Sequence, residues 1–277
     1  MKKPKYYPGK ANGRLSLIDF DGAQWACECS CGQTAFFCEK DLTEVRSCGC
    51  IVILALDLAT NSGWAVRYSW RKPAAIQCGV FNVGSNDAGD DVSWETKYAL
   101  TSNQVYRLIL EHKPDFVVIE EAEHRVTQFS KKKKNPVTGA LEESSTINPN
   151  ALQLTGISGA AIGTCMNMGV PCGTIPSRSW HSKYHGKGNK PGLKEDWKDV
   201  AIRACHQENI PLPSTKKDQK DAAEAVCISA CWHWCNVLDL NWMRKRFLDL
   251  RTGAAKALAR KKAERSSSND LFAGQVA

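Results

Sequence analysis

An apolar run that delivers a single carboxylate constrains this chain more than any other feature of its sequence. Residues 51–56 are all apolar, Asp57 follows them at once, and the chain resumes as Trp-Ala-Val directly after Gly63. This pattern predicts a buried strand, a tight turn and a second strand, which together form a hairpin. A carboxylate in such a strand is costly to bury unless it is paired or binds a metal. Asp57 is therefore the first candidate ligand of a metal site.

Two further segments place carboxylates in similar contexts. The apolar run 116–119 ends in Glu120, so this side chain also lies at the end of a predicted strand. Asp218, Asp221 and Glu224 follow one another at a spacing of three, which puts them on one face of a helix. Asp218 alone fits a solvated first helical turn, whereas alanines flank Asp221 and Glu224 and permit close packing on a sheet. The spacing leaves open whether Asp218 or Glu224 completes the site.

Carboxylates on the buried side of a helix repel each other unless a cation neutralises them. Two strands and one helix that contribute such groups can together hold two Mg²⁺ ions, with Mn²⁺ as an alternative, since these ions prefer oxygen ligands. Two ions that bridge a phosphate activate the attacking water and stabilise the leaving oxygen. The residues expected to ligate the metal and carry catalysis are Asp57, Glu120, Asp221 and Glu224.

A second group of potential metal ligands lies near the start of the chain. Six of the thirteen cysteines fall within residues 27–50, which suits a reduced compartment with one metal module better than a set of disulfides. Zinc takes four ligands, typically from two short cysteine turns. The predicted structural zinc ligands are Cys29, Cys31, Cys48 and Cys50. Cys27 is the leading substitute, Cys38 is expected in a strand, and a metal-free cysteine cluster is the alternative.

The pattern of the chain predicts three segments: a small module over 1–50, an α/β domain over 51–240, and a basic helix with a disordered tail over 241–277. Consecutive short strands followed by alternating helices and strands favour a mixed sheet. Strands are expected at 51–57, 63–69, 76–83, 115–120 and 170–175. Helices are expected at 95–112, 150–168, 193–207 and 219–236, and a basic helix at 241–264. Residues 126–149 and 183–192 are expected to be loops.

Positive charge lies beside these carboxylates. The formal net charge is +8, and residues 244–265 alone hold nine Lys/Arg against two acids, a net of +7. Basic segments next to an acidic site suit a polyanionic substrate, because the acids alone would repel phosphates. Phe129 is a candidate for stacking on a base, with loop anchoring as the alternative. Candidate phosphate contacts, against the alternative of ordinary solvated lysines, are Lys131, Lys132, Lys133, Lys134, Lys183 and Lys194.

The carboxylate pattern resembles the RuvC-type Holliday-junction resolvases of the ribonuclease H-like superfamily. The resemblance rests on Ile53–Val66, Val117–Glu120, the helix from Ala151 to Met168 and the run Asp221-Ala222-Ala223-Glu224-Ala225. Asp57, Glu120 and Asp221 match family positions, whereas Glu224 departs from the usual Asp. Residues 9–50 are similar to small zinc-ribbon modules of phage proteins, which implies a structural zinc and DNA contact.

This resemblance implies a ribonuclease H-like mixed sheet flanked by helices and preceded by a small zinc ribbon. It also implies a homodimer that binds branched DNA and cuts two opposed strands of a four-way junction. Gly156, Gly159 and Gly163 permit close helix approach at a dimer face or, equally, on the sheet. No apolar run reaches the length of a membrane span, and no signal region follows the basic start, so we expect a cytoplasmic protein, in a bacterial host if phage-encoded.

Three other readings compete with a junction resolvase. A phosphotransferase of the actin–sugar kinase type shares the first loop after Asp57, but a second glycine-rich phosphate loop is missing from the sequence. A related nuclease that acts on flaps or RNA–DNA hybrids would show the same carboxylates, because substrate choice depends on dimer geometry and loop shape. A non-catalytic DNA-binding scaffold is disfavoured because every expected carboxylate is retained.

Overall fold

The structure is a computed structural model that describes residues 5–43, 45–86, 88–122, 128–134, 141–147, 149–186 and 191–255. The chain divides into two compact units. The first unit draws on the ranges Met1–Val52, Tyr68–Lys72 and Val237–Ala277, and the second on Ile53–Arg67 and Pro73–Asn236. The small predicted module thus belongs to the first unit, and the predicted α/β domain supplies the second.

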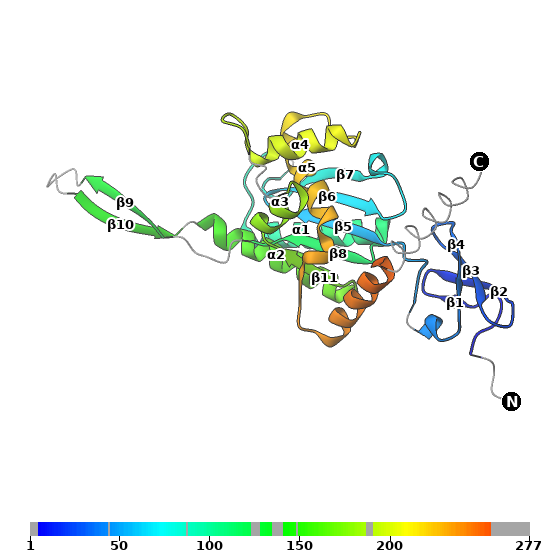
Figure 1. The fold of residues 1–277 in the computed structure, drawn as a ribbon. Helices are drawn as coiled ribbons and strands as arrows, with labels where there is room; N and C mark the ends of the chain where they lie inside the picture. The colour runs from blue at the N-terminus through cyan, green and yellow to red at the C-terminus, as the bar shows by residue number, and fades with distance from the viewer. Residues whose placement is uncertain are drawn as a thin grey trace, which may run out of the picture. The chain divides into compact units, whose positions relative to one another are not determined.

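The first unit contains a four-stranded antiparallel sheet in the order β1-β2-β3-β4 (Figure 1). Its strands are β1 (Ala11–Asn12), β2 (Leu15–Phe20), β3 (Trp25–Cys29) and β4 (Thr34–Phe37), and a short 3-10 helix, η1 (Asp41–Thr43), follows. Burial alternates along β3 and β4, so one face of the sheet carries a small apolar core. Residues 241–255 are helical, and Met243 and Phe247 are their buried side chains.

The second unit is built on a six-stranded mixed sheet in the order β12-β11-β8-β5-β6-β7. Strands β5 and β8 pair in parallel, as do β8 and β11, whereas β6 and β7 are antiparallel. Every residue of β5 is buried, as expected for a continuous apolar run in a central strand. The strands are β5 (Val52–Asp57), β6 (Asn61–Tyr68), β7 (Gln77–Asn82), β8 (Phe116–Glu120), β11 (Cys172–Ile175) and β12 (Asn236–Val237).

Helices flank this sheet (Figure 1). Helix α1 packs with α2, while α5 packs with α3 and α4 and against β7 and β8. The helices are α1 (Trp94–His112), α2 (Pro149–Asn167), α3 (Ser177–Tyr184), α4 (Trp197–Gln207) and α5 (Lys216–Ala230). Short 3-10 turns are η2 (Pro73–Ala75) and η3 (Trp232–Trp234). The predicted fold class, a mixed sheet flanked by helices with a cysteine module before it, is confirmed.

The structure corrects the sequence prediction in several places. Residues 126–149, predicted as a loop, contain the antiparallel hairpin of β9 (Gln128–Lys134) and β10 (Leu141–Ile147). Lys183, predicted in a basic loop, belongs to helix α3, which the sequence analysis missed. The helix predicted to reach residue 236 ends at Ala230, and a 3-10 turn follows. The tail predicted to be disordered lies outside the described residues. Within them, no helix is long and apolar enough to span a membrane.

Candidate metal centres

Parallel pairing of β5 and β8 brings the first two predicted carboxylates together. The register joins Leu56 to Ile119, so Asp57 and Glu120 follow at the same edge of the sheet. Asp57 is only 8% exposed, because helices cover the strand that delivers it. The indole Nε1 of Trp180, a fully buried residue of α3, donates a hydrogen bond to Glu120 Oε1 at 3.3 Å. This bond restrains the Glu120 carboxylate beside Asp57.

Helix α5 supplies the other two predicted carboxylates, Asp221 and Glu224, from much further along the chain. The helix lies close against β6 at Gly63, where an added Cβ atom would clash with the carbonyl group of Asp221. Ala222 and Ala223 are fully buried, so small side chains permit this close packing. Thr215 caps the helix, accepting a hydrogen bond from the backbone N–H of Asp218. The helix therefore presents Asp221 and Glu224 toward the sheet edge that carries Asp57.

Three of these carboxylates meet in one cluster. Ligand oxygens of Asp57, Asp221 and Glu224 all lie within 4.8 Å of one another, a spacing that can hold a metal ion. Burial raises the pKa of Asp57 well above its ordinary value, and the charges of Glu120 and Glu224 raise it further. Burial likewise raises the pKa of Glu224, an effect that Lys198 partly offsets. Crowded, poorly solvated carboxylates of this kind fit an oxygen-preferring divalent cation such as Mg²⁺ or Mn²⁺.

The structure places Glu224, and not Asp218, in the carboxylate cluster. Glu224 is 8% exposed and belongs to the carboxylate cluster. Asp218 instead lies in the first turn of α5, where its carboxylate accepts a hydrogen bond from the Thr215 hydroxyl at 2.7 Å. Asp218 therefore serves the start of the helix, which is the alternative that its position in the sequence also allowed.

Two polar residues that the sequence analysis did not single out contact the cluster. Lys198, on α4, places its Nζ 2.6 Å from Asp221 Oδ1 and 2.9 Å from Glu224 Oε2. Asn61, at the start of β6, donates a hydrogen bond to Asp221 Oδ2 at 2.5 Å. Neither had a distinguishing signal in the sequence, because Lys198 lies near the start of a predicted helix and Asn61 lies in a predicted turn. Only the tertiary packing of α4 and β6 against α5 identifies them.

The predicted phosphate contacts have mixed positions. Lys183 and Lys194 are exposed, and the Lys183 ammonium lies 5.1 Å from the ring centre of Trp234. Within the described residues neither forms an ion pair with the cluster, where Lys198 lies instead. The register of the hairpin pairs Phe129 with Thr146 and sets two of its lysines opposite acids. Those pairs are Lys132 with Glu143 and Lys133 with Glu142, whereas Lys131 faces Ser144 and Lys134 faces Leu141.

The four predicted zinc ligands converge in the first unit. Sγ atoms of Cys29 and Cys50 are 3.4 Å apart, and those of Cys31 and Cys48 are 3.3 Å apart. All four sulfurs lie within 4.8 Å of one another, and four thiols in one cluster fit a tetrahedral zinc ion. Hydrogen bonds from Cys48 and Cys50 lower the pKa of Cys29, and the same contacts raise the pKa of Cys48 and Cys50.

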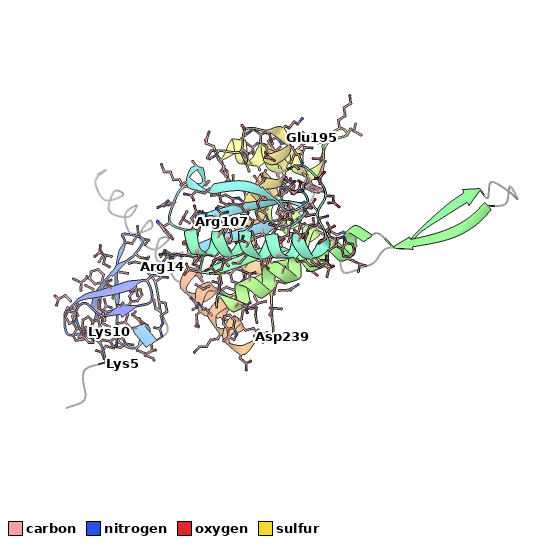
Figure 2. The ribbon with its side chains drawn as sticks, turned by 180° about the vertical axis from the view of Figure 1, so that it is seen from behind. Lys5, Lys10, Arg14, Arg107, Glu195 and Asp239 are labelled. Carbon is pink, nitrogen blue, oxygen red and sulfur yellow. The ribbon has the colours of Figure 1, made fainter. Side chains whose placement is uncertain are left out.

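Other cysteines of this unit stay outside the cluster. Cys27, the leading substitute, is buried in the apolar core, and its thiol points to the carbonyl oxygen of Trp25. Cys38 comes directly after β4 and not within a strand as predicted. Figure 2 labels Lys5, Lys10 and Arg14 in the same unit. The Lys10 ammonium lies 5.2 Å from the centre of the Tyr6 ring, and the Arg14 guanidinium lies 5.0 Å from the centre of the Trp70 ring.

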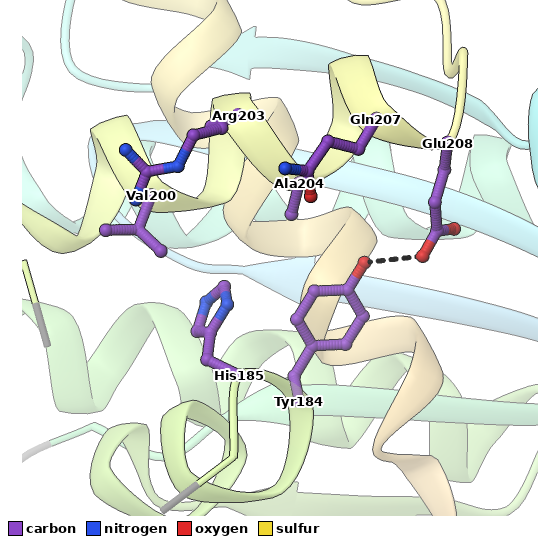
Figure 3. A pocket seen from close by; sticks show the side chains of 7 residues that line it. All are labelled: Tyr184, His185, Val200, Arg203, Ala204, Gln207 and Glu208. Atoms are coloured by element: carbon purple, nitrogen blue, oxygen red, sulfur yellow. Dashed lines mark hydrogen bonds between the residues drawn. The ribbon is translucent and has the colours of Figure 1, made fainter. Parts of the chain in front are cut away.

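A cavity of about 440 Å³ lies between α3 and α4, apart from the carboxylate cluster (Figure 3). Tyr184 donates a hydrogen bond to Glu208 Oε1 at 3.2 Å across its wall. Arg203 also lines the cavity but pairs with Glu195 at 2.5 Å. The full lining is Tyr184, His185, Val200, Arg203, Ala204, Gln207 and Glu208. None of the predicted catalytic, metal-binding or nucleic-acid-binding residues lines this cavity.

Comparisons with known proteins complete the description. No family model matches the chain, and a search of curated proteins finds no match. Among solved structures, Thermus thermophilus RuvC is 17% identical with a TM-score of 0.42, covering 68% of this chain and 100% of its own. RuvC from T. thermophilus in complex with a Holliday junction substrate is 14% identical with a TM-score of 0.46, covering 68% and 99%. The yeast mitochondrial Holliday junction resolvase Ydc2 is 12% identical with a TM-score of 0.43, covering 75% and 83%.

Proposed function

We propose that this chain is a metal-dependent endonuclease that cuts branched DNA and resolves four-way junctions. The observation that carries the proposal is the buried cluster of Asp57, Asp221 and Glu224, whose ligand oxygens lie within 4.8 Å of one another. Glu120 ends the neighbouring strand and raises the pKa of Asp57 through its charge. Four acids crowded at one sheet edge are unfavourable without cations, which is the expected signature of a site built for divalent metal ions.

The residues of the chain have distinct tasks in this proposal. Asp57, Asp221 and Glu224 would hold the metal, with Glu120 as a further ligand that the Trp180 indole orients. Asn61 fixes one oxygen of Asp221 and leaves the other directed toward Lys198. Bound divalent ions, Mg²⁺ or Mn²⁺, would supply activation of the attacking water and stabilisation of the leaving 3′-oxygen. The surrounding apolar strands exclude bulk water from the Asp57 side of the cluster.

The substrate class rests on the motifs and on charge. The run Asp221-Ala222-Ala223-Glu224-Ala225, together with Asp57 and Glu120, resembles the RuvC-type resolvases, whose activity requires a homodimer on a four-way junction. The net charge of +8 suits a nucleic-acid substrate. We therefore include in the proposal a homodimer, cutting two opposed strands, and a zinc-loaded cysteine module that supports DNA binding. The free state of all thirteen cysteines suits a reducing cytoplasm.

The test is Mg²⁺-dependent cleavage of a synthetic four-way junction beside a linear duplex, a flap, a single strand and an RNA–DNA hybrid. We expect paired symmetric nicks confined to the junction. Asp221→Asn should lower cleavage by more than about 100-fold, because it removes one metal ligand. Asp218→Asn is the matched control on the same helix, and it should cleave like the parent chain because Asp218 only caps the first turn.

The alternatives predict other outcomes. Cleavage of flaps or hybrids in preference to junctions would keep the metal site and replace the substrate, as a related nuclease requires. Tight junction binding without cleavage in Mg²⁺ or Mn²⁺ would indicate a non-catalytic scaffold and overturn the proposal. Light scattering on the junction complex tests the homodimer, for which two chains per junction are expected.

A further inference from the structure

The lysine inside the carboxylate cluster is the least expected feature of the second unit. From its contacts we infer that Lys198 is an internal cation that holds Asp221 and Glu224 until a divalent metal ion displaces it, and that its freed ammonium group then binds a phosphate of the substrate. Metal binding and DNA binding would therefore strengthen each other through one side chain. The inference rests on the proposed function and adds to it a device that couples the two ligands.

The contacts of Lys198 are those of a cation that satisfies a metal-binding cluster. Its Nζ lies 2.6 Å from Asp221 Oδ1 and 2.9 Å from Glu224 Oε2, and these acids are 14% and 10% exposed in their side chains. Burial alone would lower the pKa of Lys198, but the carboxylates of Glu224, Asp221 and Asp57 raise it above its ordinary value. The ammonium is therefore charged and bridges two of the three acids that converge there.

A metal ion and this ammonium group compete for the same oxygens. Divalent ions such as Mg²⁺ approach carboxylate oxygens to about 2.1 Å, closer than any lysine can. Asn61 already donates to the other oxygen of Asp221, so a metal ion bound by this carboxylate would compete with Lys198 for Oδ1. Two positive groups on one oxygen would also repel each other in a buried site. We therefore expect metal binding to displace Lys198 from Asp221.

The helix that bears Lys198 is anchored independently of this contact. Lys220 of α5 pairs with Asp196 at 2.9 Å and with Asp199 at 3.4 Å, at the start of α4. Asp196 and Asp199 also form a capping box there. Each helix thus contributes one lysine that pairs with acids of the other helix, and the ion pairs of Lys220 lie outside the carboxylate cluster. The lysine side chain is long and flexible, so Lys198 can leave the acids while the backbone of α4 stays in place.

The displaced ammonium has a clear destination in a nuclease. The Lys198 side chain is 37% exposed, so it reaches solvent at the mouth of the carboxylate cluster. A phosphodiester brought to the metal supplies an anion there that replaces the two lost carboxylates. Because coupling between two ligands is reciprocal, DNA that engages Lys198 must raise metal affinity by the same factor as metal raises DNA affinity.

The experiment measures Ca²⁺ binding by calorimetry to the full chain, since Ca²⁺ prefers oxygen ligands and leaves the cysteine cluster alone. The chains compared are the parent, Lys198→Met, Lys198→Arg and the matched control Lys220→Met. Without DNA, we expect Lys198→Met to bind Ca²⁺ about tenfold more tightly, the order of effect for losing a partly exposed charge-assisted contact. Lys220→Met should equal the parent, and Lys198→Arg should remain near it because the cation is kept.

A second titration adds a four-way junction. The junction should tighten Ca²⁺ binding of the parent and of Lys220→Met about tenfold, and it should tighten that of Lys198→Met by less than about twofold. Circular dichroism establishes that each variant is folded, and Lys198→Arg tests the device even if Lys198→Met is unstable. Unchanged or weaker Ca²⁺ binding by folded Lys198→Met, or equal coupling in all chains, would overturn the inference alone. Failure of the parent to bind Ca²⁺, Mg²⁺ or Mn²⁺ would overturn the proposed function as well.

Discussion

Buried acids in this chain are held in an unfavourable state at the level of single residues. Asp57 and Glu224 are each 8% exposed, and burial raises the pKa of both. A carboxyl group whose pKa is higher in the folded than in the unfolded chain binds its proton more tightly when folded. Its contribution to stability is therefore largest below the unfolded pKa and declines as the pH rises through the folded pKa. At neutral pH these acids destabilise the metal-free chain.

Because the charge of Asp57 is unfavourable in the folded chain at neutral pH, Asp57→Asn should stabilise the metal-free chain. The measurement uses a chelator that removes divalent ions such as Mg²⁺ but leaves zinc in place. The neutral amide removes a buried charge, so we expect the melting temperature of the second unit to rise at pH 7, by about 2–4 °C for each 1 kcal/mol. The gain should shrink as the pH is lowered toward the unfolded pKa of aspartate, about 3.9. Scanning calorimetry across pH measures both effects, with Asp218→Asn as the control. A variant less stable than its parent at pH 7 would refute this account of the site.

The four carboxylates could be predicted from sequence because each one interrupts or ends an apolar pattern. Asp57 and Glu120 follow apolar strands, and Asp221 and Glu224 stand among alanines. Lys198 could not be predicted, because a lysine at the start of an amphipathic helix is ordinarily solvated. The basic contacts predicted from the sequence were Lys183 and Lys194 instead, and both side chains are exposed to solvent.

At the scale of elements, the approach of α5 to β6 determines where the ligands stand. Gly63 has no side chain at the point where the backbone of Asp221 passes. Strand glycines often mark such a close approach of another backbone. The positions of Asp221 and Glu224, the two proposed metal ligands on α5, therefore depend on a glycine that is not itself a proposed ligand.

Gly63→Ala should accordingly push α5 outward and disturb the cluster. We expect a loss of about 2 kcal/mol in unfolding free energy, within the range for overpacking, and metal binding at least about tenfold weaker. Gly159→Ala is the control, because a Cβ atom at Gly159 in α2 meets no atom within 4 Å and alanine favours the helix. Chemical denaturation and Ca²⁺ calorimetry give the two quantities. Equal metal affinity in the two variants would mean that α5 does not set the ligand geometry.

Elements with clear apolar patterns were predictable, and polar ones were not. Strands β5 and β8 and helix α1 lie within a residue or two of their predicted bounds. The hairpin of β9 and β10 was mistaken for a loop because four successive lysines show no alternation. The register places Lys132 opposite Glu143 and Lys133 opposite Glu142 in this hairpin.

At the scale of the whole molecule, the two units of the chain differ in how their cores are built. The second has a six-stranded sheet covered by helices. The sheet of the first is small, with a core of ten buried residues that includes Cys27, Cys29 and Cys50. Domains with so small a core are usually stabilised by disulfides, metal ions or oligomerisation. The cysteine spacing predicted a metal module in this unit. Nothing in the sequence predicted that residues 237–255 belong to the same unit.

The zinc content of the purified chain tests the proposed zinc site in the first unit. Cys48→Ser should reduce bound zinc from about one ion per chain to nearly none, because a structural site needs all four ligands. Cys38→Ser, outside the cluster, should keep its zinc. Atomic absorption on the purified chains gives the stoichiometry. Full zinc occupancy in Cys48→Ser would mean that Cys27 or another thiol replaces it.

The hydrogen bond between Asn61 and Asp221 spans 160 residues of sequence, and it has a consequence for how the protein is made. A ribosome releases the chain from its beginning, so Asp57 and Glu120 emerge long before the residues of α5. A nascent or prematurely terminated chain carries only half of the acidic cluster and cannot assemble the rest. Under the proposed function, truncated fragments would therefore be unable to cut DNA, because two of the four proposed metal ligands arrive only with α5.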